Sequence, residues 1–373
     1  MKIESLQLRE IIDSRTNPTV EAEINESYGK APSGASTGRH EVDCSVPEHL
    51  DATEELLGKL EGKDLTQQEF DKKLRELDGT DDFSRIGAAS IATSFAFKKS
   101  SGFNHSEKFP YPLSNVIGGG EHGGNTAIQE FLVVPVEAES FPEAVRTNAE
   151  IYQELKERYS RKVQGINDEG ALITSMDDEN TLKAVKKVAD DYGARVGLDV
   201  AAGEMYEDGE YRVDSMHERF SGEEMLEFIQ KLIDEFNLLY VEDPFDQDDF
   251  EMHAKLASKN PDVLVCGDDL FTTNKERLRE GIEKRACNSL IVKPNQIGTV
   301  SDALETVELA KSEDYVPVVS HRSGETCDAT ISDLALEWEA PFIKAGIADI
   351  RIAKLNRLIR LWDQEGGEMN DDF

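Results

Sequence analysis

Six charged or polar side chains each follow a short apolar run in the second half of the chain. They are Asp199, Glu242, Asp268, Lys293, His321 and Lys344. After the first interval, which is longer, the spacing between neighbours is close to one strand plus its following helix. Because the carboxyl ends of all strands in a closed βα barrel meet at one mouth, we expect these groups to share one site.

Three of the six are carboxylates: Asp199, Glu242 and Asp268. Hard oxygen ligands without histidine or cysteine suit Mg²⁺ better than Zn²⁺. The alternative is that an acid at a strand end caps the next helix, where its charge is stabilised by about 0.3–1 kcal/mol. We expect this capping role for Asp243 and Asp269, the second members of their acidic pairs, and favour a metal site for the three strand-end acids.

Cationic and hydroxyl groups complete the same set. A free lysine has a pKa of about 10.4, but burial and a nearby divalent cation both lower the pKa, so Lys293 is a candidate proton acceptor. A salt bridge from Lys293 to the ligand carboxylates fits the spacing equally well. In "SHRSGE", His321, Arg322 and Ser323 form a group suited to binding a phosphate or carboxylate. Lys344 adds another cation.

The chain as a whole is strongly acidic, so an acidic cluster alone indicates little. Its 373 residues include 76 acids and 41 bases, and the formal charge is -35. This charge keeps a protein soluble and argues against nucleic-acid binding, and adaptation to high salt is the simplest explanation. In "LLYVEDPFDQDDFE" Glu242 is the candidate ligand, and the acids beyond the strand are interpreted as solvated surface: Asp246, Asp248, Asp249 and Glu251.

The patterns of strands and helices predict two domains. Residues 3–24 alternate as two strands, and residues 47–101 have a helical pattern. From about residue 131, short apolar runs alternate with helical stretches, which is typical of parallel βα units. We expect an α/β protein with a small N-terminal α+β domain, residues 1–125, followed by a TIM-like βα barrel, residues 126–373.

Two classes of protein are disfavoured. The four cysteines, Cys44, Cys266, Cys287 and Cys327, are widely spaced, so neither a zinc site nor a disulfide framework is expected. No apolar stretch has membrane-spanning length, and the first residues do not resemble a secretion signal. We expect a soluble cytoplasmic protein that binds neither membranes nor nucleic acid.

A series of motifs, in the right order, makes the sequence resemble the enolase family over nearly its whole length. They are "DSRTNPTVEAE", "APSGASTG", "GGGEHGGN", "IQEFLVVP", "NDEG", "GLDVAA", "VEDPFDQDD", "GDDLFTTN", "KPNQIGT", "SHRSGET", "IKAG" and "RIAKLNRLIR". The presence of both "SHRSGET" and "KPNQIG" distinguishes enolase proper from the wider superfamily. The chain is similar to a shortened, acidic enolase of archaeal or halophilic type.

The resemblance implies the reversible dehydration of 2-phosphoglycerate to phosphoenolpyruvate, a lyase reaction of glycolysis and gluconeogenesis. It also implies two Mg²⁺ ions in each active site and a homodimer or a higher oligomer. At matching positions, Asp199, Glu242 and Asp268 would hold the tightly bound Mg²⁺. Ser36 would close over the site and help to hold the second ion.

The resemblance also implies roles for the remaining groups. Lys293 would remove the proton next to the substrate carboxylate, and Glu169, supported by Glu130, would protonate the departing hydroxyl. Arg322 and Ser323 would bind the phosphate. Four further residues would line the substrate: His122, Gln129, His321 and Lys344. The physics agrees, because proton removal adds negative charge to a carboxylate, and cations aimed at its oxygens stabilise that charge.

The sequence departs from the family pattern at several positions. Thr16 stands where the family has glycine, Cys327 stands where it has glutamate, and 348–350 replaces the usual Arg-Ser-Glu run. Two alternatives therefore stay open: a divergent paralogue with weak or altered activity on a related phospho-hydroxy acid, and a non-catalytic scaffold. The presence of Lys293 and Glu169 argues against the scaffold, which has no need of them.

Overall fold

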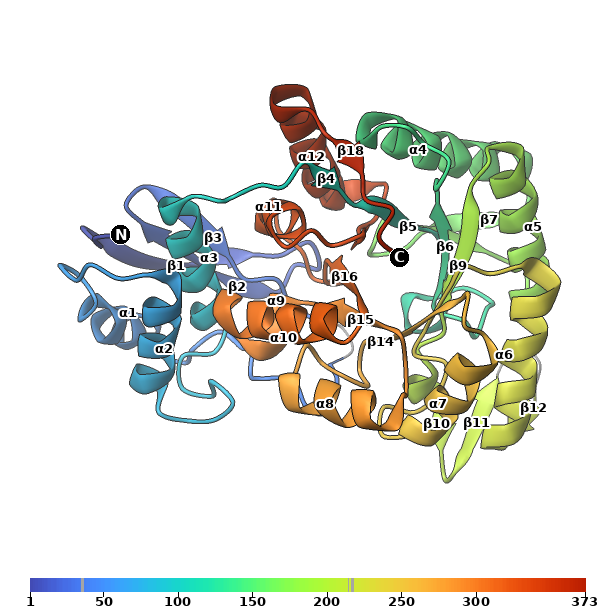
Figure 1. The fold of residues 1–373 in the computed structure, drawn as a ribbon, viewed down its shortest axis with the longest axis horizontal. Helices are drawn as coiled ribbons and strands as arrows, with labels where there is room; N and C mark the ends of the chain where they lie inside the picture. Colours follow the sequence, from blue (N-terminus) through green and yellow to red (C-terminus); the bar gives the residue numbers. More distant parts are fainter. Residues whose placement is uncertain (35–36, 214, 216–217) are drawn as a thin grey trace.

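The computed structural model describes residues 1–34, 37–213, 215 and 218–373. Two parts can be distinguished in the ribbon, a small sheet with helices at one end and a larger barrel surrounded by helices (Figure 1). This arrangement agrees with the α/β fold class expected from the sequence. None of the helices in the described part of the chain combines the length and apolar character that a membrane span requires.

The N-terminal part consists of a three-stranded antiparallel sheet and three helices. The two strands expected within residues 3–24 are present, and a third follows directly. Helix α2 has clear boundaries in the sequence, since Thr66 forms a capping box with Glu69 and Gly79 ends the helix in the left-handed conformation at φ 76°. The elements are β1 (Leu6–Ile12), β2 (Pro18–Ile24), β3 (Ser27–Lys30), α1 (Leu50–Gly58), α2 (Gln67–Asp78) and α3 (Ala89–Ser101).

Eight strands of the ten-stranded sheet close into a barrel, because the last of them pairs with the first. Their side chains are almost all buried, as expected of strands covered by helices on one side and filling a barrel on the other. The barrel strands are β5 (Tyr111–Gly118), β6 (Glu130–Val134), β9 (Arg195–Asp199), β13 (Tyr240–Glu242), β14 (Leu264–Gly267), β15 (Ser289–Val292), β16 (Val316–Ser320) and β17 (Phe342–Lys344). The other two, β7 (Val163–Ile166) and β8 (Leu172–Thr174), extend the sheet beside β5.

Two features of the barrel differ from a uniform run of parallel βα units. Strand β6 is antiparallel to both of its neighbours, β5 and β9, because β5 and β6 are joined by a glycine-rich loop without the crossover helix that a parallel connection requires. Strand β5 is hydrogen-bonded into the barrel although it precedes the division expected between residues 125 and 126. That division stays a prediction.

Helices follow most of the barrel strands and cover them from outside (Figure 1). Side chains at most of their N-caps accept a backbone N–H, as Ser140, Asp177, Ser221 and Asn274 do. The helices are α4 (Phe141–Arg158), α5 (Asp178–Asp191), α6 (Gly222–Phe236), α7 (Phe250–Lys259), α8 (Lys275–Lys284), α9 (Pro294–Ile297), α10 (Val300–Ser312), α11 (Thr330–Glu337) and α12 (Ile352–Glu365). Short elements are β4 (Lys108–Phe109), β10 (Tyr206–Glu207), β11 (Glu210–Val213), β12 (Glu218–Phe220), β18 (Glu368–Met369), η1 (Gly120–His122), η2 (Ala202–Met205) and η3 (Asp349–Arg351).

A buried polar contact joins the N-terminal part to the barrel. The Asp71 carboxylate in α2 accepts hydrogen bonds from the Ser94 hydroxyl at 2.8 Å and from the backbone N–H of Ser301 at 2.9 Å. Nearby, the backbone N–H of Ser33 donates to the carbonyl of Gly324 at 2.7 Å, and the reverse bond is 2.8 Å long. The second contact holds the loop before residue 35 against the segment that follows β16.

Candidate active site

The residues predicted from the sequence meet at one mouth of the barrel. The antiparallel direction of β6 contributes to this, since it brings Glu130, the first residue of β6, beside Asp199, the last residue of β9. One cavity is lined by nearly all of the predicted residues that the structure describes: His122, Gln129, Glu130, Glu169, Asp199, Asp268, Lys293, His321, Arg322, Ser323 and Lys344. Five of the six strand-end groups therefore line one cavity, and their role in a shared site stays a prediction.

Among the predicted residues that the structure describes, Glu242 does not line this cavity. Ser36 lies outside the described residues. Glu242 is completely buried beneath the cavity, where its Oε2 accepts hydrogen bonds from the Tyr240 hydroxyl at 2.6 Å and from Lys344 Nζ at 2.7 Å. Its other oxygen, Oε1, is buried without a hydrogen-bond partner. An unpartnered oxygen on a buried carboxylate is costly unless something positive binds it.

Lys344 connects the acids on one side of the mouth. Its Nζ lies 2.7 Å from Asp199 Oδ2, 2.7 Å from Glu242 Oε2 and 3.0 Å from Glu130 Oε2. Asp199 and Glu242 are direct neighbours in the strand register, which explains why one ammonium group reaches both. Burial lowers the pKa of Lys344, but the surrounding carboxylates outweigh burial and raise that pKa well above its usual value. Lys344 is therefore held as a cation.

Lys293 forms an ion pair with the third strand-end acid, Asp268. Its ammonium group forms a buried ion pair with Asp268 Oδ2, and Gln296 donates to Asp268 Oδ1 at 2.9 Å. Burial lowers the pKa of Lys293, but Asp268 raises it, and the net pKa lies above the usual value. The salt bridge that the sequence left open as an alternative for Lys293 is thus present. A cation bound to Asp268 would compete with Lys293 for the same oxygens.

The carboxylates of the mouth are candidates for a metal site. Within the described residues, two groups of acid or histidine atoms lie within 4.8 Å of one another: Asp243, Asp268 and Asp269, and separately His122, Glu130 and Glu169. Asp199 and Glu242 belong to neither group, because Lys344 lies between their oxygens. The all-oxygen donor set and the unpartnered Glu242 Oε1 fit a hard cation such as Mg²⁺.

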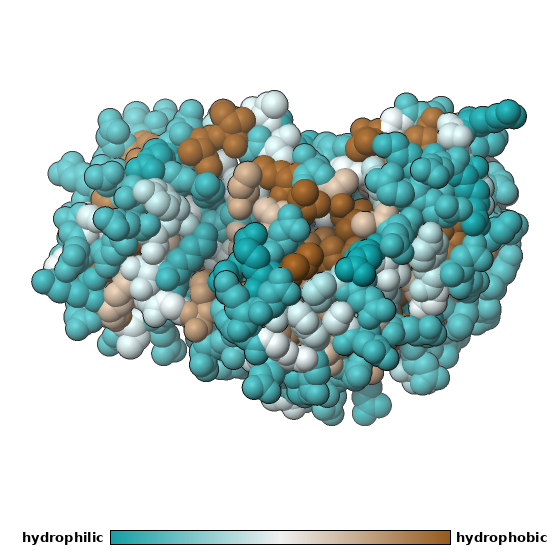
Figure 2. Space-filling view, turned by 90° about the horizontal axis from the view of Figure 1, so that it is seen from above, coloured by the Kyte–Doolittle hydropathy of each residue, from teal (hydrophilic) through white to brown (hydrophobic). Residues whose placement is uncertain are grey.

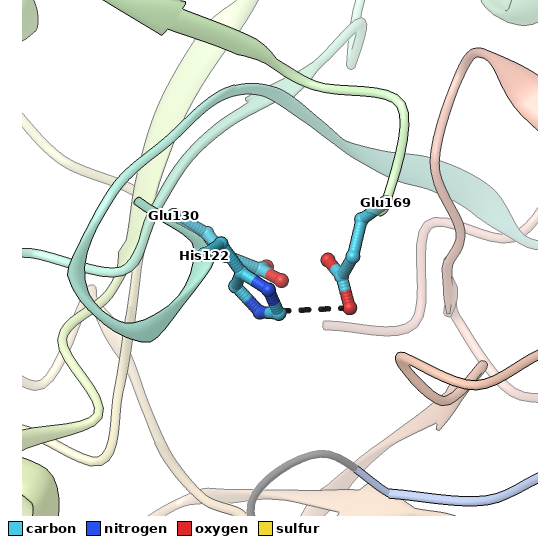
Figure 3. A group of neighbouring side chains, drawn as sticks. All are labelled: His122, Glu130 and Glu169. Carbon is cyan, nitrogen blue, oxygen red and sulfur yellow. Dashed lines mark ion pairs between the residues drawn. The ribbon is translucent and has the colours of Figure 1, made fainter. Parts of the chain in front are cut away.

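His122, Glu130 and Glu169 also line the cavity, and their side chains point toward one another (Figure 3). His122 Nε2 faces Glu169 Oε1 at 3.7 Å, and Nδ1 lies 2.9 Å from Asp168 Oδ1. Burial opposes protonation of His122, but the hydrogen bond to Asp168 and the charges of Glu169 and Glu130 raise its pKa to about 9. His122 is therefore a cation beside two glutamates at neutral pH.

The two glutamates differ in charge. Burial, together with the charges of Glu169 and Asp199, raises the pKa of Glu130 to about 8, although Lys344 opposes the shift. Burial also acts on Glu169, but the positive charges of His122 and Arg351 outweigh it and lower the pKa of Glu169 below its usual value. Of the two, Glu130 is therefore the group that binds a proton more readily, and Glu169 the one that ionises more readily. A pair of this kind can store a proton and release it to a leaving group.

The anion-binding group contains a residue that sequence reasoning missed. Arg322 Nη1 pairs with Glu41 Oε2 at 2.7 Å and donates to Asn295 Oδ1 at 3.2 Å. Glu41 also accepts the backbone N–H of Gly38 at 3.0 Å, so it ties Arg322 to the loop that contains Ser36. Glu41 lies three residues beyond the motif "APSGASTG" and resembles any other acid of this acidic chain. Its role could not be predicted without knowing that Arg322 lies beside it.

The expected helix-capping roles of Asp243 and Asp269 are wrong. Helix α7 is capped by Asp249 and α8 by Asn274. Asp243 instead lies under the mouth with φ 40°, and its carboxylate accepts the backbone N–H groups of Asp268 at 2.9 Å and Asp269 at 2.7 Å. The helices begin several residues after these strands, so neither acid reaches a helix end. Asp243 fixes the backbone of the predicted ligand Asp268.

Comparisons with known proteins agree with this geometry. Residues 3–109 match the model of the enolase N-terminal domain, and residues 106–370 match the model of the enolase C-terminal TIM barrel domain. An enolase of Natronomonas pharaonis is 47% identical, with 96% of this chain and 98% of that protein covered. The enolase of Methanosphaera stadtmanae is 43% identical, with 97% of each covered.

A third relative extends the same match. The enolase of Halobacterium salinarum is 44% identical, with 97% of this chain and 99% of that protein covered. The family models and these relatives span almost the whole chain, including the loops that carry the cavity residues. The chain belongs to the enolase family.

Proposed function

We infer that this protein catalyses the reversible dehydration of 2-phosphoglycerate to phosphoenolpyruvate, a hydro-lyase reaction of glycolysis and gluconeogenesis. One observation carries this inference. A single cavity is lined by a lysine paired with a strand-end carboxylate and by a glutamate pair in which Glu130 binds a proton more readily than Glu169. A base and an acid that face one cavity are what a stepwise removal of a proton and a hydroxyl requires.

We assign Lys293 as the base and Glu169, with Glu130, as the acid. Lys293 removes the proton next to the substrate carboxylate once Asp268 no longer holds the ammonium form. Glu130 carries the stored proton at neutral pH, and its position within 4.8 Å of Glu169 and His122 supports delivery to the departing hydroxyl through this pair. His122, Gln129, His321 and Lys344 line the substrate.

We assign Asp199, Glu242 and Asp268 as ligands of one Mg²⁺. When bound, this ion neutralises the negative charge that develops on the substrate carboxylate. The buried, unpartnered Oε1 of Glu242 supports the assignment. A second Mg²⁺ would be held with the help of Ser36 and the substrate itself. Arg322, aligned by Glu41 and Asn295, binds the phosphate together with Ser323.

The decisive assay is the formation of phosphoenolpyruvate from 2-phosphoglycerate by the purified chain, with and without Mg²⁺, over a series of KCl concentrations. We expect Mg²⁺-dependent turnover that chelation abolishes. The absence of turnover at every salt and Mg²⁺ concentration, in a chain that circular dichroism shows to be folded, would contradict the proposed function.

We propose that the protein works in the cytoplasm and at high salt. Its four cysteines are all unpaired in the structure, which fits a reducing compartment. Figure 2 shows a face covered mainly by hydrophilic residues, with apolar side chains gathered near its middle. A net charge of -35 produces repulsion that salt screens. Activity and thermal stability should therefore increase from low to high KCl concentration.

We also propose a homodimer. Ile12, Ile166 and Ile352 are exposed, and each lies within three residues of Arg15, Asp168 or Arg351 in the chain. These three residues contact one another: the Asp168 side chain pairs with Arg15 at 3.2 Å, and the Asp168 carbonyl accepts a hydrogen bond from Arg351 at 3.1 Å. Exposed apolar side chains on neighbouring segments favour contact with another copy. Light scattering of the purified chain should give twice the 41.6 kDa mass of one chain.

A further inference from the structure

Arg351 is one of the largest completely buried side chains of the molecule. It ends η3, immediately before α12, and carries none of the roles assigned above. A buried arginine is costly unless its charge and its donors are matched by partners. The partners of Arg351 come from three segments around the cavity, which suggests a function for the side chain beyond packing.

The guanidinium group uses all three of its nitrogen atoms. Nε donates to His321 Nδ1 at 3.1 Å. Nη1 donates to the Asp168 carbonyl at 3.1 Å and to Asp349 Oδ2 at 3.2 Å. Nη2 donates to the Arg322 carbonyl at 3.3 Å and to the Ser323 carbonyl, and it lies 4.0 Å from Glu169 Oε1. Arg351 thus contacts the segments that carry the acid pair and the anion-binding group.

The bond to His321 determines where the imidazole proton lies. A guanidinium group is always protonated and has no acceptor atom, so Nδ1 of His321 must be the acceptor. A neutral imidazole whose Nδ1 accepts carries its proton on Nε2. His321 lines the cavity, so this tautomer makes it a hydrogen-bond donor within the site.

We propose that Arg351 is a positioning residue that keeps His321 neutral with its proton on Nε2, ready to donate to the anionic substrate, and that holds the Arg322 and Ser323 backbone in place. Without Arg351, Nδ1 could take the proton, and Nε2 would then present a lone pair to an anion. The statement about substrate rests on the proposed function, whereas the statement about the tautomer does not.

The charges around His321 favour the same state. Burial is the first cause that lowers its pKa, and the cations Arg351, Lys344 and Lys354 lower the pKa further, while Glu169 opposes them. The resulting pKa lies well below the usual value of 6.5. His321 therefore stays neutral over the working pH range, and its tautomer becomes the property that matters.

Close packing keeps Arg351 in this position. A Cβ on Gly346 would lie 2.8 Å from Arg351 Cδ and 3.0 Å from the Glu169 carbonyl, so the segment after β17 approaches both groups only because it carries glycine there. Gly170 has φ +83° and likewise leaves room for Ala348, because a Cβ on Gly170 would lie 3.1 Å from Ala348 atoms. The two glycines let η3 approach the loop that holds Glu169.

The tautomer can be measured directly in the unmodified chain. The ¹⁵N chemical shifts of imidazole nitrogens separate protonated from unprotonated atoms, and the chain has only seven histidines to label. The His321→Gln variant identifies the signals of His321 by their loss. We expect His321 to be neutral with the proton on Nε2 from pH 6 to pH 8. A proton on Nδ1, or an imidazolium at neutral pH, would overturn the proposal without any use of variants at Arg351.

Kinetics of variants test the role in turnover. We expect Arg351→Met to lower kcat/KM by about 10–100-fold, the usual effect of removing a partner that orients a site histidine. The defect should shrink as the pH falls through the pKa of His321, since an imidazolium carries a proton on Nε2 again. A purely structural defect would not depend on pH in this way. Arg351→Lys should restore part of the activity.

Arg357→Met is the matched control, because Arg357 is a nearby arginine, within α12, that is paired with Asp333 and does not line the cavity. It should leave both kcat/KM and the His321 signals unchanged. If Arg351→Met is folded and its defect is the same at every pH, the positioning role is wrong. If the wild-type chain shows the expected tautomer but no turnover, the proposed function fails and the tautomer assignment stands.

Discussion

Two kinds of carboxylate lie within a few residues of each other in the stretch 240–251. Glu242 and Asp243 are buried at the barrel mouth, whereas Asp248 and Glu251 are exposed. The buried pair is matched by specific partners, an ammonium group and a tyrosine hydroxyl for Glu242 and two backbone N–H groups for Asp243. The exposed Asp248 contacts the basic side chains of Arg39, His40 and Arg277 at the surface.

The difference shows that charge content says little about where a strongly acidic chain does chemistry. Burial of one unmatched charge costs several kcal/mol, so each acid of the mouth must keep its partners, bind a cation or take up a proton. A surface ion pair contributes about 0–1 kcal/mol, and water or salt replaces it easily. The buried acids stand at the end of a strand or directly after it, whereas the exposed acids lie further along the chain. The predictions below test this separation, from the largest effect to the smallest.

Removal of the lysine that faces the mouth should have the largest effect. We expect Lys293→Ala to lower turnover by at least about 1000-fold, the scale of losing a general base, because no other described amine contacts Asp268. Mg²⁺ binding, measured by calorimetry, should be retained. The control is Lys255→Ala, which removes an exposed lysine paired with Glu223. Turnover by Lys293→Ala close to wild type would remove Lys293 as the base.

Loss of one predicted ligand should act mainly on the metal. We expect Asp268→Ala to weaken Mg²⁺ binding by at least about 100-fold, since a missing ligand should cost no less than the 10–100-fold typical of a missing outer partner. Asp246→Ala, a change in an acid beyond the strand, serves as the comparison. Equal Mg²⁺ affinities for the two variants would refute the ligand assignment and the distinction drawn between the two kinds of acid.

The buried proton of Glu130 should appear in the pH dependence of stability. Its pKa is raised to about 8 in the folded protein, so the folded form favours the protonated state, and this contribution is lost as the pH rises through 8. The Glu130→Gln variant has no carboxyl group to ionise at this position, so it does not lose this contribution to stability as the pH rises. The unfolding free energy of the variant relative to wild type should therefore increase between pH 7 and pH 9 in urea titrations. A constant difference over this range would show that Glu130 is ionised throughout.

An exposed acid should give the smallest effect. We expect Asp248→Asn to change the unfolding free energy by less than about 1 kcal/mol, although it touches three basic side chains, and to leave turnover unchanged. The change should be smaller still in high KCl. A loss of turnover comparable to that of Asp268→Ala would break the comparison on which this account rests.

Much of the barrel could be predicted because its strands are short apolar runs that end at a charged group, as at Asp199 and Glu242. Strand β5 could not, since its segment "YPLSNVIG" contains a proline and two polar residues, and only the short η1 separates it from β6. The antiparallel direction of β6 was hidden for a related reason, because a glycine-rich loop carries no signal of chain direction. It nevertheless explains why Glu130 reaches the mouth from the start of its strand.

Most residues that line the cavity could be predicted, but their supporting contacts could not. Lys293 and His321 stand at strand ends, where the fold itself indicates a role. Glu41, Asp243 and Arg351 depend on contacts between segments far apart in the sequence. Arg351 in particular lies in a helical pattern beside other arginines, and only its complete burial distinguishes it from them.

The most direct test of the central claim is the position of the metal in crystals grown with Mn²⁺ in place of Mg²⁺, located by anomalous diffraction. We predict a peak about 2.0–2.1 Å from oxygens of Asp199, Glu242 and Asp268, the distance expected for a Mg²⁺-type site, with the Lys344 ammonium group displaced from between the first two. A peak bound only by Asp243 and Asp269, or no peak beside the strand ends, would contradict the account.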